Sequence, residues 1–140
     1  MSDLGHISLR DRSFNVKRAA VTRCGKTWHI EIESHPKVYD NELWTPCLYH
    51  QALLLDAETG DDLQRKVVSW KLQTGPEYLH PEIGSMYVFG HHDIRHCKLA
   101  FGRYDGNRVE VQWEGICDVF WDDEFSENVP FICRAFAETK

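Results

Sequence analysis

Apolar and polar residues alternate with a period of two along much of the chain, which is the pattern of strands that bury one face. In residues 109–114 the apolar Val109, Val111 and Trp113 alternate with polar residues, and residues 28–33 repeat the pattern. Side chains on a strand point alternately to its two faces, so each such segment has one apolar and one polar face. The alternation therefore predicts a fold built mainly from β-strands.

Turn-forming residues separate the expected strands. Gly25 can adopt a positive φ angle and predicts a tight turn that joins residues 14–23 to the strand after it. The sequence Asp-Gly-Asn at residues 105–107 is a strong turn signal between residues 94–104 and 109–121. The chain is therefore expected to contain at least two β-hairpins.

The remaining segments fit the same class of fold. Turn-forming residues predict loops over residues 34–47, 57–61, 75–84 and 122–128, with one helical turn at residues 76–79. Further strands are expected over residues 48–56, 63–72, 86–89 and 130–137. No segment of ten or more residues has the period of an amphipathic helix. We therefore predict a single domain, residues 1–140, whose antiparallel sheet forms a sandwich or a flattened barrel with little helix.

Composition limits the class of protein. The 140 residues are 42% hydrophobic, which allows a sizeable core. The longest aliphatic run, residues 52–55, is far shorter than the ~20 residues that cross a bilayer, and residues 1–12 have no apolar stretch of a secretion signal. The five cysteines are odd in number and include no Cys-x-x-Cys pair. We therefore expect a cytoplasmic protein with reduced thiols and no membrane contact.

Charge is distributed unevenly along the chain. The net charge is −6, but residues 1–28 contain six Lys and Arg against two Asp, whereas residues 29–140 contain ten Lys and Arg against twenty Asp and Glu. The second segment therefore has a net charge of −10. A body with this charge repels a nucleic-acid backbone and attracts a cationic partner. The alternative is that the charge only keeps the protein in solution.

One short stretch concentrates the acidic residues near a predicted turn. Five acids fall within ten residues that contain no Lys or Arg, namely Asp118, Asp122, Asp123, Glu124 and Glu127. A stretch of this kind is either a solvated turn or a docking surface for a basic partner. Trp44, in a predicted loop, is a candidate anchor beside it if its ring is exposed. Burial is the alternative for Trp44, because an indole ring offers a large apolar area.

A second polar cluster contains the residue types that bind metal ions. His91, His92, His96 and Cys97 are all possible zinc ligands. Their spacing fits no usual template, and on a strand residues four apart are separated by ~13 Å. Neighbouring strand residues also point to opposite faces, so nothing assembles a base beside the Cys97 thiol. No nucleotide-binding or hydrolase motif is present. We therefore expect no metal, no cofactor and no catalytic residues.

Residues 86–136 resemble the C-terminal part of small bacterial immunity proteins of polymorphic-toxin systems, including contact-dependent inhibition. The resemblance rests on the strand Val109–Gly115, the acidic and aromatic segment Asp118–Phe125, and Asn128–Phe131. It implies a cytoplasmic, non-catalytic protein that binds one cognate toxin, and many such toxins are nucleases with basic clefts. Immunity families diverge widely, so the resemblance transfers no binding residues.

Three functions remain open on the sequence. The first is an immunity-type inhibitor that binds a basic toxin domain through the acidic stretch. The second is a small-molecule-binding β-barrel or sandwich protein, which requires a large apolar cavity. The third is a metal-dependent enzyme that uses the His-rich segment, which requires three or more protein ligands around one ion. A filled core with an exposed acidic surface favours the first.

Overall fold

The computed structural model describes residues 4–39, 41–70, 85–87, 91–121 and 124–140. Within these residues the chain forms eleven strands and one short helix. In chain order they are β1 (Gly5–Leu9), β2 (Arg12–Cys24), β3 (Thr27–Ser34), β4 (Lys37–Tyr39), β5 (Glu42–Trp44), β6 (Cys47–Leu54), α1 (Gly60–Leu63), β7 (Val67–Trp70), β8 (Ser85–Tyr87), β9 (His91–Tyr104), β10 (Arg108–Trp121) and β11 (Glu124–Thr139). The predicted mainly β fold is confirmed.

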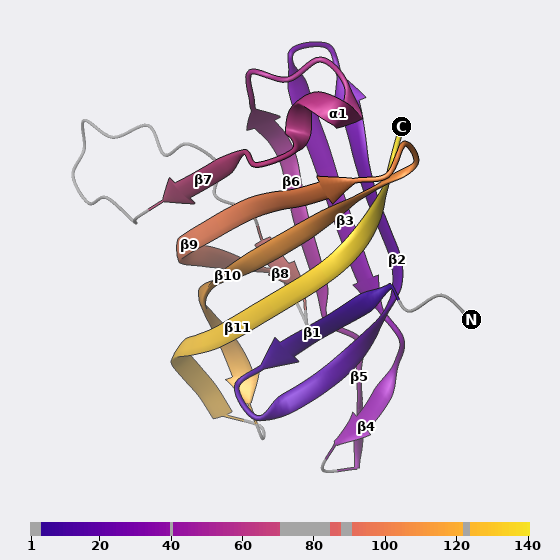
Figure 1. Ribbon diagram of the computed structural model, residues 1–140. Helices are drawn as coiled ribbons and strands as arrows, with labels where there is room; N and C mark the ends of the chain where they lie inside the picture. Colours follow the sequence, from indigo (N-terminus) through magenta and orange to yellow (C-terminus); the bar gives the residue numbers. More distant parts are fainter. Residues whose placement is uncertain (1–3, 40, 71–84, 88–90, 122–123) are drawn as a thin grey trace, which may run out of the picture.

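Nine of these strands form one strongly curled sheet. Its order is β10-β11-β1-β2-β3-β6-β8-β9-β7, and β9 also pairs with β10, so the sheet curls back on itself as a half-barrel (Figure 1). The pairings are antiparallel except where the end of β11 runs parallel to β2 at Glu138 and Thr139. β4 and β5 form a separate hairpin at one end of the half-barrel. The two predicted hairpins are present as β2–β3 and β9–β10.

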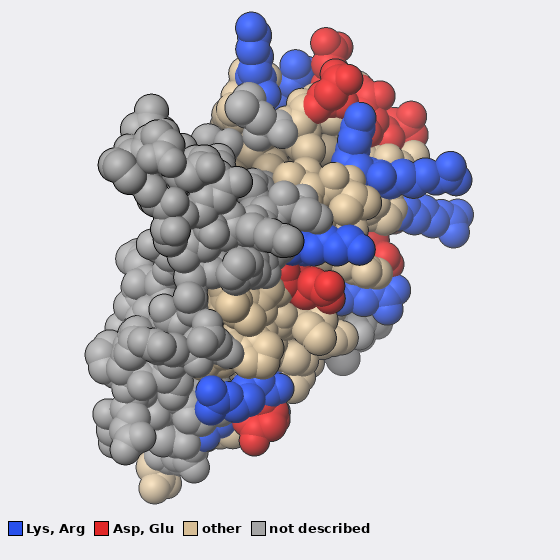
Figure 2. Space-filling model, turned by 90° about the vertical axis from the view of Figure 1, so that its left-hand side faces the viewer, with Lys and Arg blue, Asp and Glu red and all other residues tan. Residues whose placement is uncertain are grey.

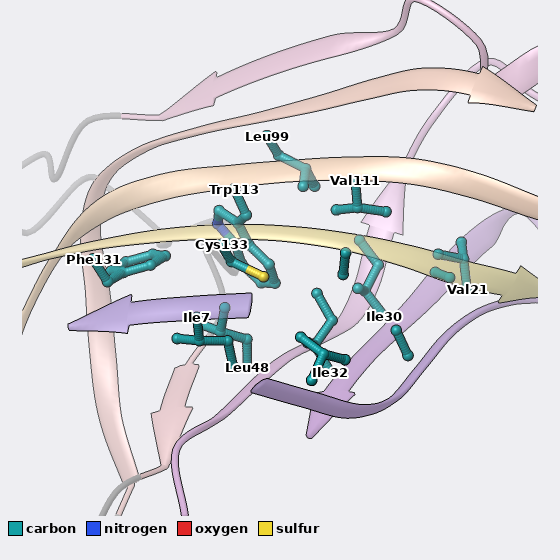
Figure 3. Close-up of a cluster of buried hydrophobic side chains, with 14 of the residues drawn as sticks. Ile7, Val21, Ile30, Ile32, Leu48, Leu99, Val111, Trp113, Phe131 and Cys133 are labelled. Atoms are coloured by element: carbon teal, nitrogen blue, oxygen red, sulfur yellow. The ribbon is translucent and has the colours of Figure 1, made fainter. Parts of the chain in front are cut away.

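The core lies between two groups of strands that cross at a steep angle in Figure 1. β9, β10, β11 and β1 form the front group, and β2, β3 and β6 lie behind them. The strict alternation of β3 buries Trp28, Ile30 and Ile32 and leaves the residues between them partly exposed. Figure 3 shows Ile30 and Ile32 in one cluster of buried side chains with Trp113 and Phe131 of the front group. Large side chains therefore fill the space between the two groups.

The structure differs from the predicted elements in three places. The strand expected over residues 63–72 begins only at Val67, because Leu63 belongs to α1, where Thr59 is the N-cap and accepts a hydrogen bond from the N–H of Asp62. The loop expected over residues 34–47 contains the β4–β5 hairpin. The loop expected over residues 122–128 is mostly strand, because β11 begins at residue 124. The helical turn expected at residues 76–79 lies outside the described residues.

β1 passes unusually close to β11 at its first residue. Gly5 is buried and has a φ angle of +106°. A Cβ atom at this position would overlap the backbone carbonyl oxygen of Arg134. Glycine is therefore required here for two reasons, because the φ angle is unfavourable for other residues and the neighbouring backbone leaves no space.

Candidate partner-binding surface

Three of the five acidic residues singled out in the sequence, Asp118, Glu124 and Glu127, lie where β10 ends and β11 begins. The pairing of the two strands shifts register after Cys117, so one β10 residue, Asp118, lies opposite two β11 residues, Glu127 and Asn128. Such a bulge bends the strand and increases its twist locally. The register therefore places Asp118 and Glu127 at the same level of the hairpin.

Glu124 lies at the start of β11, where it pairs with Trp121 at the end of β10. Asp122 and Asp123 lie between these two residues in sequence and fall outside the described residues. No Lys or Arg occurs anywhere from residue 115 to residue 133. We call residues 118–127 the acidic hairpin end. The topology thus places the three described acids, Asp118, Glu124 and Glu127, at the same end of one hairpin.

Trp44 does not contribute an exposed ring to this surface. Its side chain is 1% exposed, and its indole N–H donates to the carbonyl of Tyr39 at 3.3 Å. The guanidinium of Arg12 lies 4.6 Å from the Trp44 ring centroid and 5.0 Å from that of Tyr39. The prediction of an exposed Trp44 anchor is therefore corrected, because a cation–π stack with Arg12 and the core bury the ring.

The four candidate metal ligands all lie on β9. His91 pairs with Tyr87 of β8, and Cys97 pairs with Trp70 of β7, so the whole segment is an extended strand. The strand rise separates His92 from His96 by ~13 Å along the chain. The side chains of these residues lie outside the described part of the structure. Elsewhere in that part, no three His, Cys, Asp or Glu residues are grouped as a metal site.

A second group of acids escaped the sequence analysis, which treated the segment as a simple turn. Asp56, Glu58, Asp61 and Asp62 surround α1 and are all exposed. We call them the α1-end acids. Figure 2 shows acidic side chains gathered at the upper end of the molecule, where α1 lies in Figure 1. The sequence does indicate this acidic group, because residues 56–62 contain four acids and no Lys or Arg.

One of these acids has a structural role. The Asp62 carboxylate accepts backbone hydrogen bonds from Glu58 at 3.0 Å and Thr59 at 3.2 Å, which completes a capping box at the start of α1. These two hydrogen bonds lower the pKa of Asp62 below its ordinary value. The segment is held to the half-barrel because Gly60 packs closely under the ring of Tyr104.

Carboxylates on the faces of the sheet are compensated by neighbouring cations. One guanidinium nitrogen of Arg18 lies 3.0 Å from both Glu31 and Glu33, and Arg134 lies 2.9 Å from Glu110. The hydrogen bond from Arg18 lowers the pKa of Glu33. The α1-end acids form no ion pair within the described residues. The α1-end acids therefore lack, within the described residues, the direct ion pairs that Glu31, Glu33 and Glu110 form.

The described cysteines do not provide a reactive thiolate in the core. Cys47, Cys117 and Cys133 are buried, and Cys24 is exposed. Burial raises the pKa of Cys133 to about 12, and it also raises the pKa of Cys47. A thiol with a raised pKa stays protonated at neutral pH and is a poor nucleophile.

No protein-family model matches the chain, and no match was found among curated proteins or solved structures. Within the residues that the structure describes, no helix has the length and apolar character needed to span a membrane. Inference about function therefore starts from the chain's own residues and their arrangement.

Proposed function

We propose that the protein is a cytoplasmic, non-catalytic inhibitor of the immunity type, which binds a cognate toxin domain with a basic surface. The observation that carries the proposal is the acidic hairpin end, where the β10–β11 register brings Asp118, Glu124 and Glu127 together in a stretch without Lys or Arg. The resemblance of residues 86–136 to immunity proteins supports the same function.

Electrostatics explains what such a surface contributes. Carboxylates that already pair with Arg side chains, such as Glu33 and Glu110, add little long-range field. A stretch of acids that contains no Lys or Arg, as in residues 118–127, favours a negative potential that steers a basic partner and raises the association rate. A basic toxin cleft is therefore the partner that fits this surface.

The core supports surface binding over the small-molecule alternative. Trp113 and Phe131 pack edge to face in the core, with ring centroids 6.4 Å apart. Trp113 is 0% exposed and Phe131 is 1% exposed. In this region the interior is filled by large side chains, so the outer surface is where a large partner would bind.

The test compares two triple variants of equal charge. Immunity proteins are encoded beside their toxins, so the partner to use is the purified toxin domain encoded by the neighbouring gene. In the first variant Asp122, Asp123 and Glu124 become Lys. In the second, the α1-end acids Asp56, Glu58 and Asp61 become Lys, while Asp62 is kept because it caps α1. Both variants change the net charge by the same amount, so general steering is matched.

Surface plasmon resonance measures association and dissociation rates for the wild type and both variants. We expect the hairpin-end variant to associate about tenfold or more slowly than the α1-end variant, because only its charges face the partner. Wild-type association should also slow as salt rises from 50 to 300 mM. Equal rates for the two variants would remove the hairpin end from the interface. Absence of wild-type binding to the toxin domain would refute the proposed function.

A further inference from the structure

A hollow of about 380 Å³ lies on the outer face of the front group of strands. These strands, β9, β10, β11 and β1, lie side by side in Figure 1. The lining of the hollow includes Ala100 of β9, Glu114 of β10, Ile132 of β11 and His6 of β1. Ala100, Ile132 and His6 each have a buried residue before and after them. The hollow therefore opens to the outside of the half-barrel and not to its core.

Hydrogen bonds to one carboxylate hold two long side chains at one side of this hollow. Glu110 accepts a hydrogen bond from the Gln112 amide at 3.0 Å and from the Arg134 guanidinium at 2.9 Å. Gln112 and Arg134 lie opposite each other in the register, so both are drawn toward Glu110. The carboxylate in turn lies over Gly102, where a Cβ atom would be 2.8 Å from Glu110 Oε1. Ala100, opposite Gln112 on β9, has a short side chain, which leaves space between the strands.

Two aliphatic side chains are exposed at this hollow. Ile132 is 55% exposed although it lies well inside the long strand β11. Val67 of β7 is 57% exposed and pairs with Ala100, so its side chain is on the same face of the sheet, next to the hollow. Single exposed aliphatic residues are common on proteins. Apolar side chains gathered at a hollow with a polar rim are instead typical of an interface.

The charges around the hollow balance one another. Lys98 lies opposite Glu114 in the register, and Arg134 pairs with Glu110 at 2.9 Å. Two cations and two carboxylates together contribute no net charge, so this region adds little long-range attraction for a partner. What it offers is contact at short range, which acts mainly on the dissociation rate of a complex.

The hollow and the acidic hairpin end lie on the same two strands. Glu114 and Asp118 are four residues apart on β10, and Glu127 and Ile132 are five residues apart on β11. At ~3.3 Å per residue, the two regions are about 13–17 Å apart along the strands. A standard protein interface covers about 800 Å² on each partner, which is wide enough to include both regions.

We propose that the partner-binding surface runs from the acidic hairpin end along β10 and β11 to this hollow, where an apolar side chain of the toxin domain packs against Ile132. The inference rests on the proposed function and adds a second component to its interface. The acids steer the basic partner, and the apolar contact holds the complex once it has formed. The polar rim around Ile132 keeps water out of that contact.

The experiment measures binding to the toxin domain that the proposed function predicts a neighbouring gene to encode. Ile132→Ala removes the apolar contact, and Ala100→Gln fills the hollow with a long neutral side chain. Leu43→Ala is the matched control, because leucine is an isomer of isoleucine and Leu43 is 60% exposed on the separate β4–β5 hairpin. Urea unfolding checks that each variant is folded. Surface plasmon resonance gives the association and dissociation rates at 50 and 300 mM salt.

We expect Ile132→Ala and Ala100→Gln to dissociate about tenfold faster than wild type at both salt concentrations, because salt does not screen an apolar contact. Leu43→Ala should match wild type. Wild-type dissociation rates in both hollow variants, or an equal change in Leu43→Ala, would overturn the inference. In that case slow association of the hairpin-end variant would still support the proposed function. Absence of wild-type binding would refute both.

Discussion

Replacing Gly5 with alanine tests the close approach of β1 and β11, which holds the front of the half-barrel together. A Cβ atom at Gly5 would overlap the carbonyl oxygen of Arg134, and it would lie 2.8 Å from that carbonyl carbon and 2.9 Å from the Cα of Ala135. All three neighbours are backbone atoms, so no side chain can rotate to relieve the contact. The strands must separate, which weakens the pairing of Gly5 with Ala135.

Gly106→Ala is the matched control for this substitution. Gly106 has a φ angle of +97°, close to the +106° of Gly5, but no atom lies within 4 Å of a Cβ placed there. Both variants therefore carry the conformational strain of alanine at positive φ, about 1–3 kcal/mol. Only Gly5→Ala adds overpacking against the neighbouring strand, which costs about 1–3 kcal/mol more. The difference between the two variants isolates the contact.

Urea unfolding followed by tryptophan fluorescence measures the two free energies of unfolding. We expect Gly5→Ala to lose about 1–3 kcal/mol more than Gly106→Ala, with the same dependence on urea concentration. Equal losses would show that β1 does not approach β11 as closely as described. A smaller loss for Gly5→Ala would refute the reasoning outright.

Three further predictions concern local interactions. Because the pKa of Asp62 is lowered in the folded protein, its carboxylate stabilises the fold at pH values above the unfolded-state pKa, and this contribution is lost as the pH falls. Asp62→Asn should therefore have a lower free energy of unfolding than wild type at pH 7, and the difference should disappear below about pH 4. An equal difference in urea titrations at both pH values would contradict this. Arg12→Met should expose Trp44 to acrylamide quenching, because the guanidinium stacks on its ring; unchanged quenching would argue against the stack. In native protein at pH 8, a thiol reagent should label Cys24 rapidly and Cys133 only after denaturation, since the first thiol is exposed and the second is buried; rapid labelling of Cys133, mapped by mass spectrometry, would contradict its burial.

Local sequence patterns predicted the strands well where one face is buried. Trp28, Ile30 and Ile32 alternate with polar residues, and all three are in the core. Turn chemistry at Gly25 and Gly106 located two hairpins, because both residues adopt the positive φ angles that their turns require. The same patterns carry no information on which distant strands pair across the sheet, so the pairing of β1 with β11 came only from the structure.

The missed elements depend on contacts between distant residues. The β4–β5 hairpin is held by Arg12, whose guanidinium stacks on Tyr39 and Trp44 from a strand far away in sequence. The burial of Trp44 follows from that stack and could not be predicted from the residues next to it in the sequence. The short helix α1 depends on the paired hydrogen bonds of Thr59 and Asp62 rather than on any helical periodicity.

The candidate site was predictable in composition but not in geometry. The absence of Lys and Arg around Asp118 and Glu127 is plain in the sequence. The bulge that sets these two residues opposite each other depends on the register between β10 and β11, which no local pattern encodes.

The proposed inhibitor function predicts that a neighbouring gene encodes a toxin domain, and neutralisation of that domain is its most direct test. The purified toxin domain is titrated with the protein while its toxic activity is measured, with the hairpin-end and α1-end charge variants titrated in parallel. Inhibition should be complete at about one molar equivalent of the wild-type protein, as expected for tight one-to-one binding. The α1-end variant should follow the wild-type curve. The hairpin-end variant should need a large excess. Full toxic activity in the presence of excess wild-type protein would contradict the account.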